Sequence, residues 1–135
     1  MIKNKYYKTF ISLFFFAFLF GGVFGGTRAL AAELIMVEAG GCHWCEVWDE
    51  EIGVIYHRTS AGKIAPLRRV DLHKKLPEDL NFLKQLAFSP TFIVVNKGVE
   101  VGRITGYPGE SFFWGQLEII LKKLPNEKIV QTKVH

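Results

Sequence analysis

The two cysteines of this chain lie three residues apart, in the segment Cys42-His43-Trp44-Cys45, directly after an apolar run and two glycines. A disulfide between them would close one of the shortest possible loops, so it would remove little conformational entropy from the unfolded chain. The fold must therefore be held together by a hydrophobic core, and the value of the pair must lie in its chemistry. An inert bridge, or two buried thiols, is the alternative that the spacing leaves open.

Residues 1–31 differ in composition from the rest of the chain and predict an export signal. The first eight residues include three lysines, and no charged residue follows before Arg28, over a stretch rich in phenylalanine. Such a run, followed by the small residues of Ala29-Leu30-Ala31, is typical of a signal peptide. We expect cleavage after Ala31, which leaves a periplasmic domain of residues 32–135. An uncleaved anchor is the alternative, because the apolar run nearly reaches the about 20 residues that span a bilayer.

The basic character of the chain lies in this leader. It holds four of the 17 Lys and Arg residues and none of the 13 Asp and Glu residues, so the remaining domain is formally neutral. A neutral domain without a basic stripe argues against nucleic-acid binding. About 100 residues are enough for one hydrophobic core. We expect a monomer without a cofactor.

Short apolar runs alternate with amphipathic stretches after the leader, which predicts an α/β domain. Their order indicates one parallel crossover followed by an antiparallel hairpin and a last helix. We expect residues 59–63 to be a polar connection and Ser111 to cap the last helix. The predicted strands are residues 34–37, 66–72, 91–95 and 99–105, and the predicted helices are residues 42–57, a segment starting at Leu76-Pro77, and 111–124.

Cys42 is expected at the start of a helix, where unpaired N–H groups and the helix dipole favour a thiolate over a thiol. His43 adds to this effect when it is protonated, whereas Glu38 and Glu46 oppose it. Cys45, one turn further on, is expected to face the core and to attack a mixed disulfide formed at Cys42. The pair is therefore a candidate redox centre, with His43 as a residue that tunes its pKa.

A metal site is a weaker interpretation of the same residues. Closed zinc coordination by Cys42, Cys45 and His43 is disfavoured, because His43 is adjacent to a ligand and the chain has no second cysteine pair. Haem attachment needs a histidine directly after the second cysteine, where Glu46 stands. We therefore expect no metal, with a module that binds a soft ion such as Cu(I) as the non-enzymatic alternative.

Further motifs in chain order make residues 34–124 resemble the thioredoxin superfamily. Besides the cysteine pair at a helix start, these are Ser89-Pro90-Thr91 before a core strand, a Lys97-Gly98 turn, and Gly106 ahead of the last helix. The resemblance implies a trimmed thioredoxin-like fold, with a central mixed sheet of about four strands flanked by helices. It is trimmed because no room remains before Leu34 for the strand and helix with which that fold usually begins.

The resemblance also implies roles for individual residues. Pro90 would be cis and lie against the disulfide, and Ser89 would present its backbone to a bound substrate, with Trp44 as a further docking residue. Met36 stands where many thioredoxins bury an acid that helps proton transfer from the second cysteine. Proton transfer would then differ from that pattern, or run through water or Glu38.

A narrower resemblance rests on Gly41 to Cys45, on Trp48-Asp49-x-Glu51-Ile52 and on Gly106 to Trp114. These segments look like the periplasmic thioredoxins of the sulfur-oxidising Sox system, the SoxS family. This implies a thiol–disulfide oxidoreductase that reduces a client protein with a disulfide or modified cysteine. The suspected client is the sulfur-carrier protein, and a membrane thiol carrier would supply the electrons. The alternative is a periplasmic disulfide oxidase or isomerase.

Overall fold

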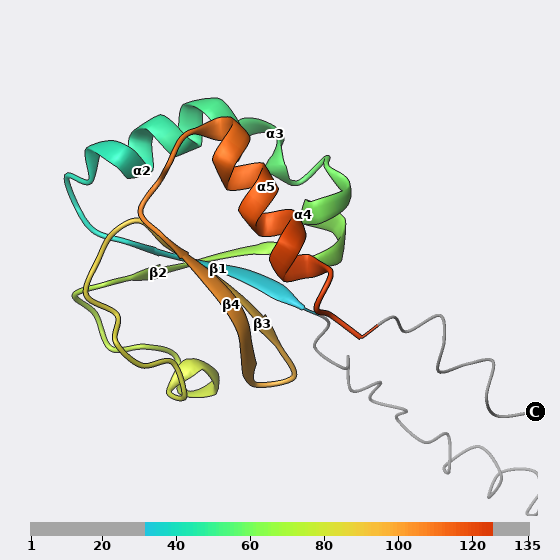
Figure 1. Ribbon diagram of the computed structural model, residues 1–135. Helices are drawn as coiled ribbons and strands as arrows, with labels where there is room; N and C mark the ends of the chain where they lie inside the picture. Colours follow the sequence, from blue (N-terminus) through green and yellow to red (C-terminus); the bar gives the residue numbers. More distant parts are fainter. Residues whose placement is uncertain (1–31, 126–135) are drawn as a thin grey trace, which may run out of the picture.

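A computed structural model describes residues 32–125 of the chain. The predicted leader, residues 1–31, and the polar tail from Asn126 lie outside the described residues. The described part is built on a four-stranded mixed sheet in the order β2-β1-β3-β4. Helices cover one face of this sheet, and the irregular segment between β2 and β3 covers the other (Figure 1).

The central strands of the sheet are the most apolar parts of the described residues. β1 (Glu33–Glu38) pairs in parallel with β2 (Leu67–Asp71) and antiparallel with β3 (Thr91–Asn96), which pairs antiparallel with β4 (Val99–Thr105). Residues 34–37 are all buried, because β1 is covered on both faces and so carries a continuous apolar run instead of an alternating one. The predicted crossover and hairpin are confirmed.

The helix predicted after the cysteines is present, but it contains a π-helical turn. α2 (His43–Trp48) continues through η1 (Asp49–Gly53) into α3 (Val54–Tyr56). Three inward side chains at steps of four residues bury this helix against the core, and Cys42 is the residue that caps its start. These three are Trp48, Ile52 and Tyr56.

Residues 59–63, predicted as a polar connection, lie largely within a short helix, α4 (Ser60–Ile64). Thr59 caps it, because the Thr59 hydroxyl oxygen accepts a hydrogen bond from the Gly62 amide at 3.0 Å. A Cβ at Gly62 would lie 2.0 Å from the backbone oxygen of Tyr56. The prediction was wrong because this cap and this close backbone contact outweigh the polar composition.

The helix predicted from Leu76 is also not formed as such. The structure has one 3₁₀ turn, η2 (Glu78–Leu80), within an otherwise irregular segment of residues 72–90. Leu80 and Leu83 are buried against the sheet all the same, so their spacing does indicate burial. Gln85 has a φ of 56°, which an α-helix does not allow.

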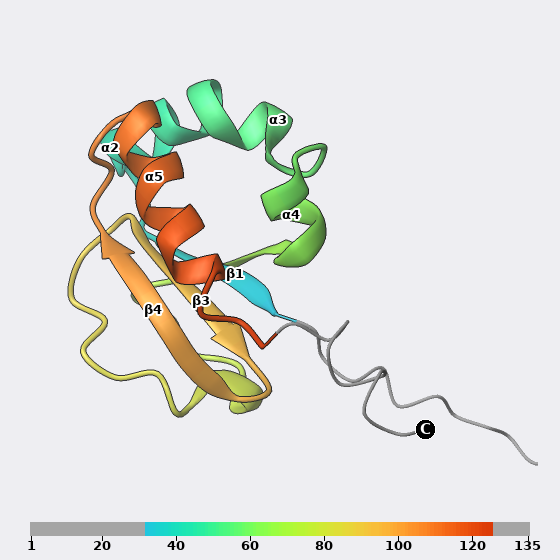
Figure 2. The same ribbon diagram turned by 45° about the vertical axis from the view of Figure 1, so that its right-hand side comes forward.

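The last helix, α5 (Glu110–Leu121), lies on the same face of the sheet as α2 (Figure 2). Its N-cap is Gly109, with a φ of 92°, and Ser111 lies inside the helix instead of capping it. A left-handed backbone at this position favours glycine. Phe113 of α5 meets Phe92 and Trp48 at ring-centroid distances of 4.9 and 5.7 Å, which forms the centre of the core.

Candidate active site

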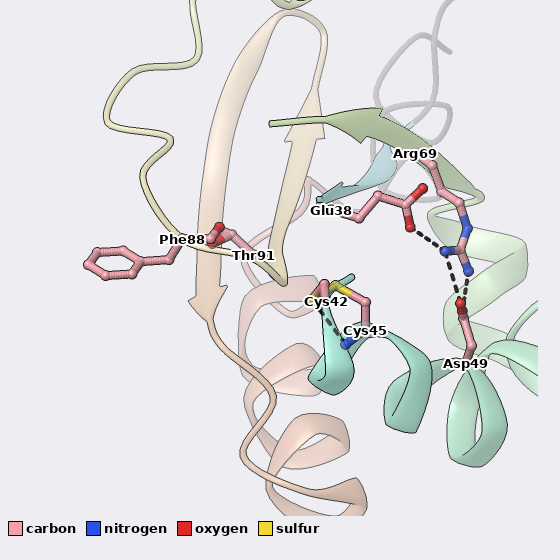
Figure 3. Close-up of a disulfide and its surroundings, with 7 residues drawn as sticks. All are labelled: Glu38, Cys42, Cys45, Asp49, Arg69, Phe88 and Thr91. Carbon is pink, nitrogen blue, oxygen red and sulfur yellow. Dashed lines mark hydrogen bonds and ion pairs between the residues drawn. A yellow bond between two sulfur atoms is a disulfide. The ribbon is translucent and has the colours of Figure 1, made fainter. Parts of the chain in front are cut away.

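Cys42 and Cys45 form a disulfide at the start of α2, beyond the carboxyl end of the central strand β1 (Figure 3). Cys42 is the N-cap residue and is partly exposed, whereas Cys45 is 5% exposed and packs into the core. One sulfur is therefore accessible to another molecule, and the other is held behind it. This asymmetry suits an attacking and a resolving cysteine.

The backbone around the pair places the Cys42 sulfur at the positive end of the helix. Gly41 turns the chain with a φ of 71°, a value that favours glycine. The Cys45 amide donates to the Cys42 sulfur at 3.2 Å, and the Cys42 carbonyl accepts from the Cys45 and Glu46 amides. Once the disulfide is reduced, such N–H groups favour the thiolate form of Cys42.

The segment before β3 carries the predicted docking residues Ser89 and Pro90. The Ser89–Pro90 peptide is cis, as the resemblance implies, and Pro90 is buried. Thr91 donates its hydroxyl to the Phe88 carbonyl at 2.7 Å, and the Gly106 amide donates to the Pro90 carbonyl at 2.7 Å. These hydrogen bonds fix the segment beside the cysteines (Figure 3).

Two exposed aromatic residues belong to the segments that carry the site: Trp44 lies between the two cysteines in the sequence, and Phe88 directly precedes Ser89. The Phe88 side chain points away from the disulfide (Figure 3). Trp44, which follows His43 on the first turn of α2, is 56% exposed, and Phe88 is 65% exposed. Trp44 was predicted as a docking residue. It does not join the core, because the first turn of α2 extends beyond the sheet (Figure 1). Sequence reasoning missed Phe88, although an apolar residue before Ser-Pro was a visible signal.

Three charged side chains connect the sheet to the active-site helix and form what we call the Arg69 network: Glu38, Arg69 and Asp49. Arg69 donates to Glu38 at 2.6 Å and to both carboxylate oxygens of Asp49, through Nη1 at 3.2 Å and through Nη2 (Figure 3). Sequence reasoning named Glu38 as an alternative proton acceptor but missed Arg69 and Asp49. Met36, which by the resemblance replaces the buried acid of many thioredoxins, is fully buried and apolar.

A hydrogen bond joins two of the segments on which the narrower resemblance rests. The Tyr107 hydroxyl donates to the carboxylate of Glu51, which ties the loop before α5 to the π turn of the active-site helix. Tyr107 itself is almost completely buried. The motif residues around positions 51 and 107 therefore hold the active-site helix and the loop before α5 together, at a distance from the cysteines in the sequence.

Within residues 32–125, no three His, Cys, Asp or Glu side chains are grouped so that they could hold a metal ion. Among the same residues, no helix has both the length and the apolar character that a membrane span needs.

Comparison with protein-family models finds no match, and neither does comparison with curated proteins. Among solved structures, the reduced form of periplasmic thioredoxin SoxS from Paracoccus pantotrophus is 39% identical, with a TM-score of 0.66. The match covers 68% of this chain and 97% of that chain. A thioredoxin from Malassezia sympodialis, Mala s 13, is 18% identical with a TM-score of 0.49, over 67% of this chain and 76% of that chain.

The match to SoxS includes nearly all of that protein, and its sequence identity is high enough to establish a family relationship. The redox-active spacing of Cys42 and Cys45, their disulfide and the four-stranded mixed sheet agree with it. The chain therefore belongs to the thioredoxin superfamily and, within it, to the family of periplasmic thioredoxin SoxS, and it is a thiol–disulfide oxidoreductase.

Proposed function

We propose that this protein works in the periplasm as a reductant of a client protein, and that the client is the sulfur-carrier protein of a Sox system. The observation that carries the proposal is the 39% identity over 97% of periplasmic thioredoxin SoxS. The predicted signal peptide, residues 1–31, supports export. Reduction would remove a disulfide or another unwanted modification from a client cysteine.

The two cysteines would act in sequence. The Cys42 thiolate attacks one sulfur of the client disulfide, forms a mixed disulfide and releases the first client thiolate. Cys45 then loses its proton and attacks the Cys42 sulfur, which releases the second client thiolate and leaves the Cys42–Cys45 disulfide. The client disulfide gains two electrons and becomes two thiolates, which take up protons from the solvent, while the protein loses two electrons and the Cys45 proton. A membrane thiol carrier then reduces the pair by the reverse exchange.

The exposure of the site residues supports these roles. Cys42 is accessible for the first attack, and buried Cys45 is protected from competing thiols. The client segment would lie between exposed Trp44 and the backbone at Ser89 and Pro90, so that its sulfur approaches Cys42. His43 is exposed next to Cys42 and, when protonated, adds to the stabilisation of the thiolate.

The mechanism predicts that Cys45→Ser traps clients. Without the resolving thiol, Cys42 remains joined to the client, and the mixed disulfide can be isolated from periplasmic extract without reductant and identified by mass spectrometry. We expect the sulfur-carrier protein, joined through its carrier cysteine. Cys42→Ser is the matched control and should trap nothing. Trapping by Cys42→Ser but not by Cys45→Ser would reverse the two roles.

A disulfide oxidase is the second candidate, favoured by the position of Cys42 at a helix start, because stabilising a thiolate makes a disulfide more oxidising. Equilibration with glutathione buffers separates the two functions. A reductase should have a potential near thioredoxin's about −270 mV, whereas a value near about −120 mV would identify an oxidase.

A further inference from the structure

The Arg69 network lies on the face of the sheet that the active-site helix covers. Leu34 and Met36 belong to the core beneath the helices, and Glu38 continues this side of β1 two residues after Met36. Arg69 is the register partner of Met36 on parallel β2, so its side chain projects to the same face. The network therefore begins beside the buried, uncharged position of Met36.

The network also reaches the helix that carries the cysteines. Asp49 follows Cys45 by four residues, and side chains at this spacing are neighbours, with Cβ atoms about 5–6 Å apart. Gly53 leaves room for the Asp49 carboxylate, because a Cβ there would lie 2.8 Å from its Oδ1 atom. The network thus stands one turn behind the resolving cysteine (Figure 3).

Arg69 is held in place and stays charged. Its guanidinium lies over the Trp48 ring, 5.7 Å from the ring centroid, between the two carboxylates. Partial burial lowers the pKa of Arg69, but hydrogen bonds with Asp49 and Glu38 outweigh this effect and keep the pKa above its usual value. With both carboxylates ionised, one positive and two negative charges leave the network with a net charge of −1.

We propose that the Arg69 network lowers the reduction potential of the Cys42–Cys45 pair and so biases the protein towards reducing its client. A disulfide is neutral, whereas the reduced pair carries thiolate charge at neutral pH. A net negative group nearby raises the free energy of the reduced pair and not that of the disulfide, so the pair gives up its electrons more readily. The network thereby opposes the helix start at Cys42. This inference deepens the proposed function and rests on it for its biological meaning.

The effect is moderate, because solvent screens the network in part. The side chains of Glu38, Arg69 and Asp49 are 34%, 35% and 43% exposed. Removing one negative charge should shift the equilibrium constant with glutathione by up to about tenfold, which is about 30 mV for this two-electron exchange. The side chains of His43 and Glu46, on the first helical turn, are exposed, where water screens charge more.

Charge substitutions in the full chain test this proposal. Glu38→Gln and Asp49→Asn bring the network to zero and should raise the potential, whereas Arg69→Gln brings it to −2 and should lower it. The double variant Glu38→Gln/Arg69→Gln restores −1 while it abolishes the ion pairs, so its potential should return to that of the wild type. Glu50→Gln is the matched control, because it removes the same charge from the exposed side of the helix next to Asp49.

A double variant whose potential stays far from the wild type would overturn the proposal, because the ion pairs would then act through structure and not through charge. So would an unchanged potential in both Glu38→Gln and Asp49→Asn, or an equal shift in Glu50→Gln. Thermal unfolding of each variant identifies any that fails to fold. A strongly oxidising wild type with the predicted order of variants would instead refute the reductase function and leave the network's role intact.

Discussion

The two faces of the sheet are built from different side chains. The helix-covered face buries an aromatic core: Trp48, Tyr56, Phe92, Tyr107 and Phe113. The opposite face, covered by residues 72–90, buries only aliphatic side chains among its fully buried residues: Ile35, Val37, Val70, Leu80, Leu83, Ile93 and Val95. Regular helices provide the covering layer in one case, and a largely irregular segment provides it in the other.

The cysteines and the proposed docking residues of the site depend on different faces of the sheet. Cys42 and Cys45 sit on the helix-covered side, where the aromatic core gives α2 a rigid base. Ser89 and Pro90, the proposed docking edge for the client, end the irregular segment that covers the other side, so we expect this edge to depend on how firmly that segment is held. We expect the position of the cysteines to change little when surrounding residues are substituted, and the position of the docking edge to change more.

Removing a large core side chain from the helix-covered face should have the largest effect on stability. Phe113 is fully buried among the rings of Phe92, Trp114, Trp48 and Tyr107. Phe113→Ala leaves a cavity that rigid aromatic neighbours cannot fill, and it should cost about 3–5 kcal/mol in the free energy of unfolding. Urea denaturation of the oxidised protein measures this.

Leu83→Ala on the opposite face is the comparison. An irregular segment can relax into the space, so the loss should lie near about 2 kcal/mol, the low end for such a substitution. If Phe113→Ala does not fold, Phe113→Leu provides a milder test and should still lose about 1–2 kcal/mol. Equal losses for Phe113→Ala and Leu83→Ala would mean that the two faces are equally rigid.

The sequence predicts the helix-covered face better than the other, for a physical reason. The strand of residues 91–95 is a short continuous apolar run, and the helix after Cys42 has an amphipathic period, and both patterns are typical of a regular backbone. The leucines at 80 and 83 show the same helix-like spacing, but a single 3₁₀ turn is enough to bury them, and the spacing alone cannot distinguish the two. The predicted helix there was wrong for this reason.

The same limit applies to the site. The cysteine pair and Ser89-Pro90 are local motifs, so they could be predicted without a structure. The Arg69 network joins residues 38, 49 and 69, which come together because β1 and β2 pair in one particular register and the π turn directs Asp49 towards them. Nothing local in the sequence shows that register, so the contacts of Arg69 could not be predicted.

Loosening the irregular segment should change docking without touching the cysteines. Arg103 of β4 pairs with Glu100 and donates to the carbonyls of Lys84 and Gln85 at 3.1 and 3.3 Å. Arg103→Gln removes these charge-assisted hydrogen bonds, which together should contribute about 1–2 kcal/mol to the local stability of the segment. The KM for a protein disulfide such as insulin should therefore rise several-fold, which is the increase that this loss of local stability allows.

Reduction of a small disulfide, such as oxidised glutathione, is the internal control, because it needs little docking surface and should proceed at the wild-type rate. Hydrogen exchange should show faster opening of residues 80–90 in Arg103→Gln. An insulin KM equal to that of the wild type, together with faster exchange, would show that the docking edge does not depend on how the segment is held.

The smallest effect on stability should come from an ion pair that holds the irregular segment to β2 and depends on pH. Arg68 holds Asp79 through two hydrogen bonds, at 2.5 and 3.0 Å, and these lower the pKa of the Asp79 carboxyl below its usual value. A lowered pKa in the folded state means that the anchor is fully present above the unfolded pKa of about 3.9 and is lost as pH falls through the folded value. The urea midpoint of Asp79→Asn should therefore lie slightly below that of the wild type at pH 7 and should converge with it as the pH falls through the lowered pKa of Asp79. Glu78→Gln removes an exposed charge from the neighbouring position and should show no such convergence, whereas a gap that persists in acid would assign the effect to shape and not to ionisation.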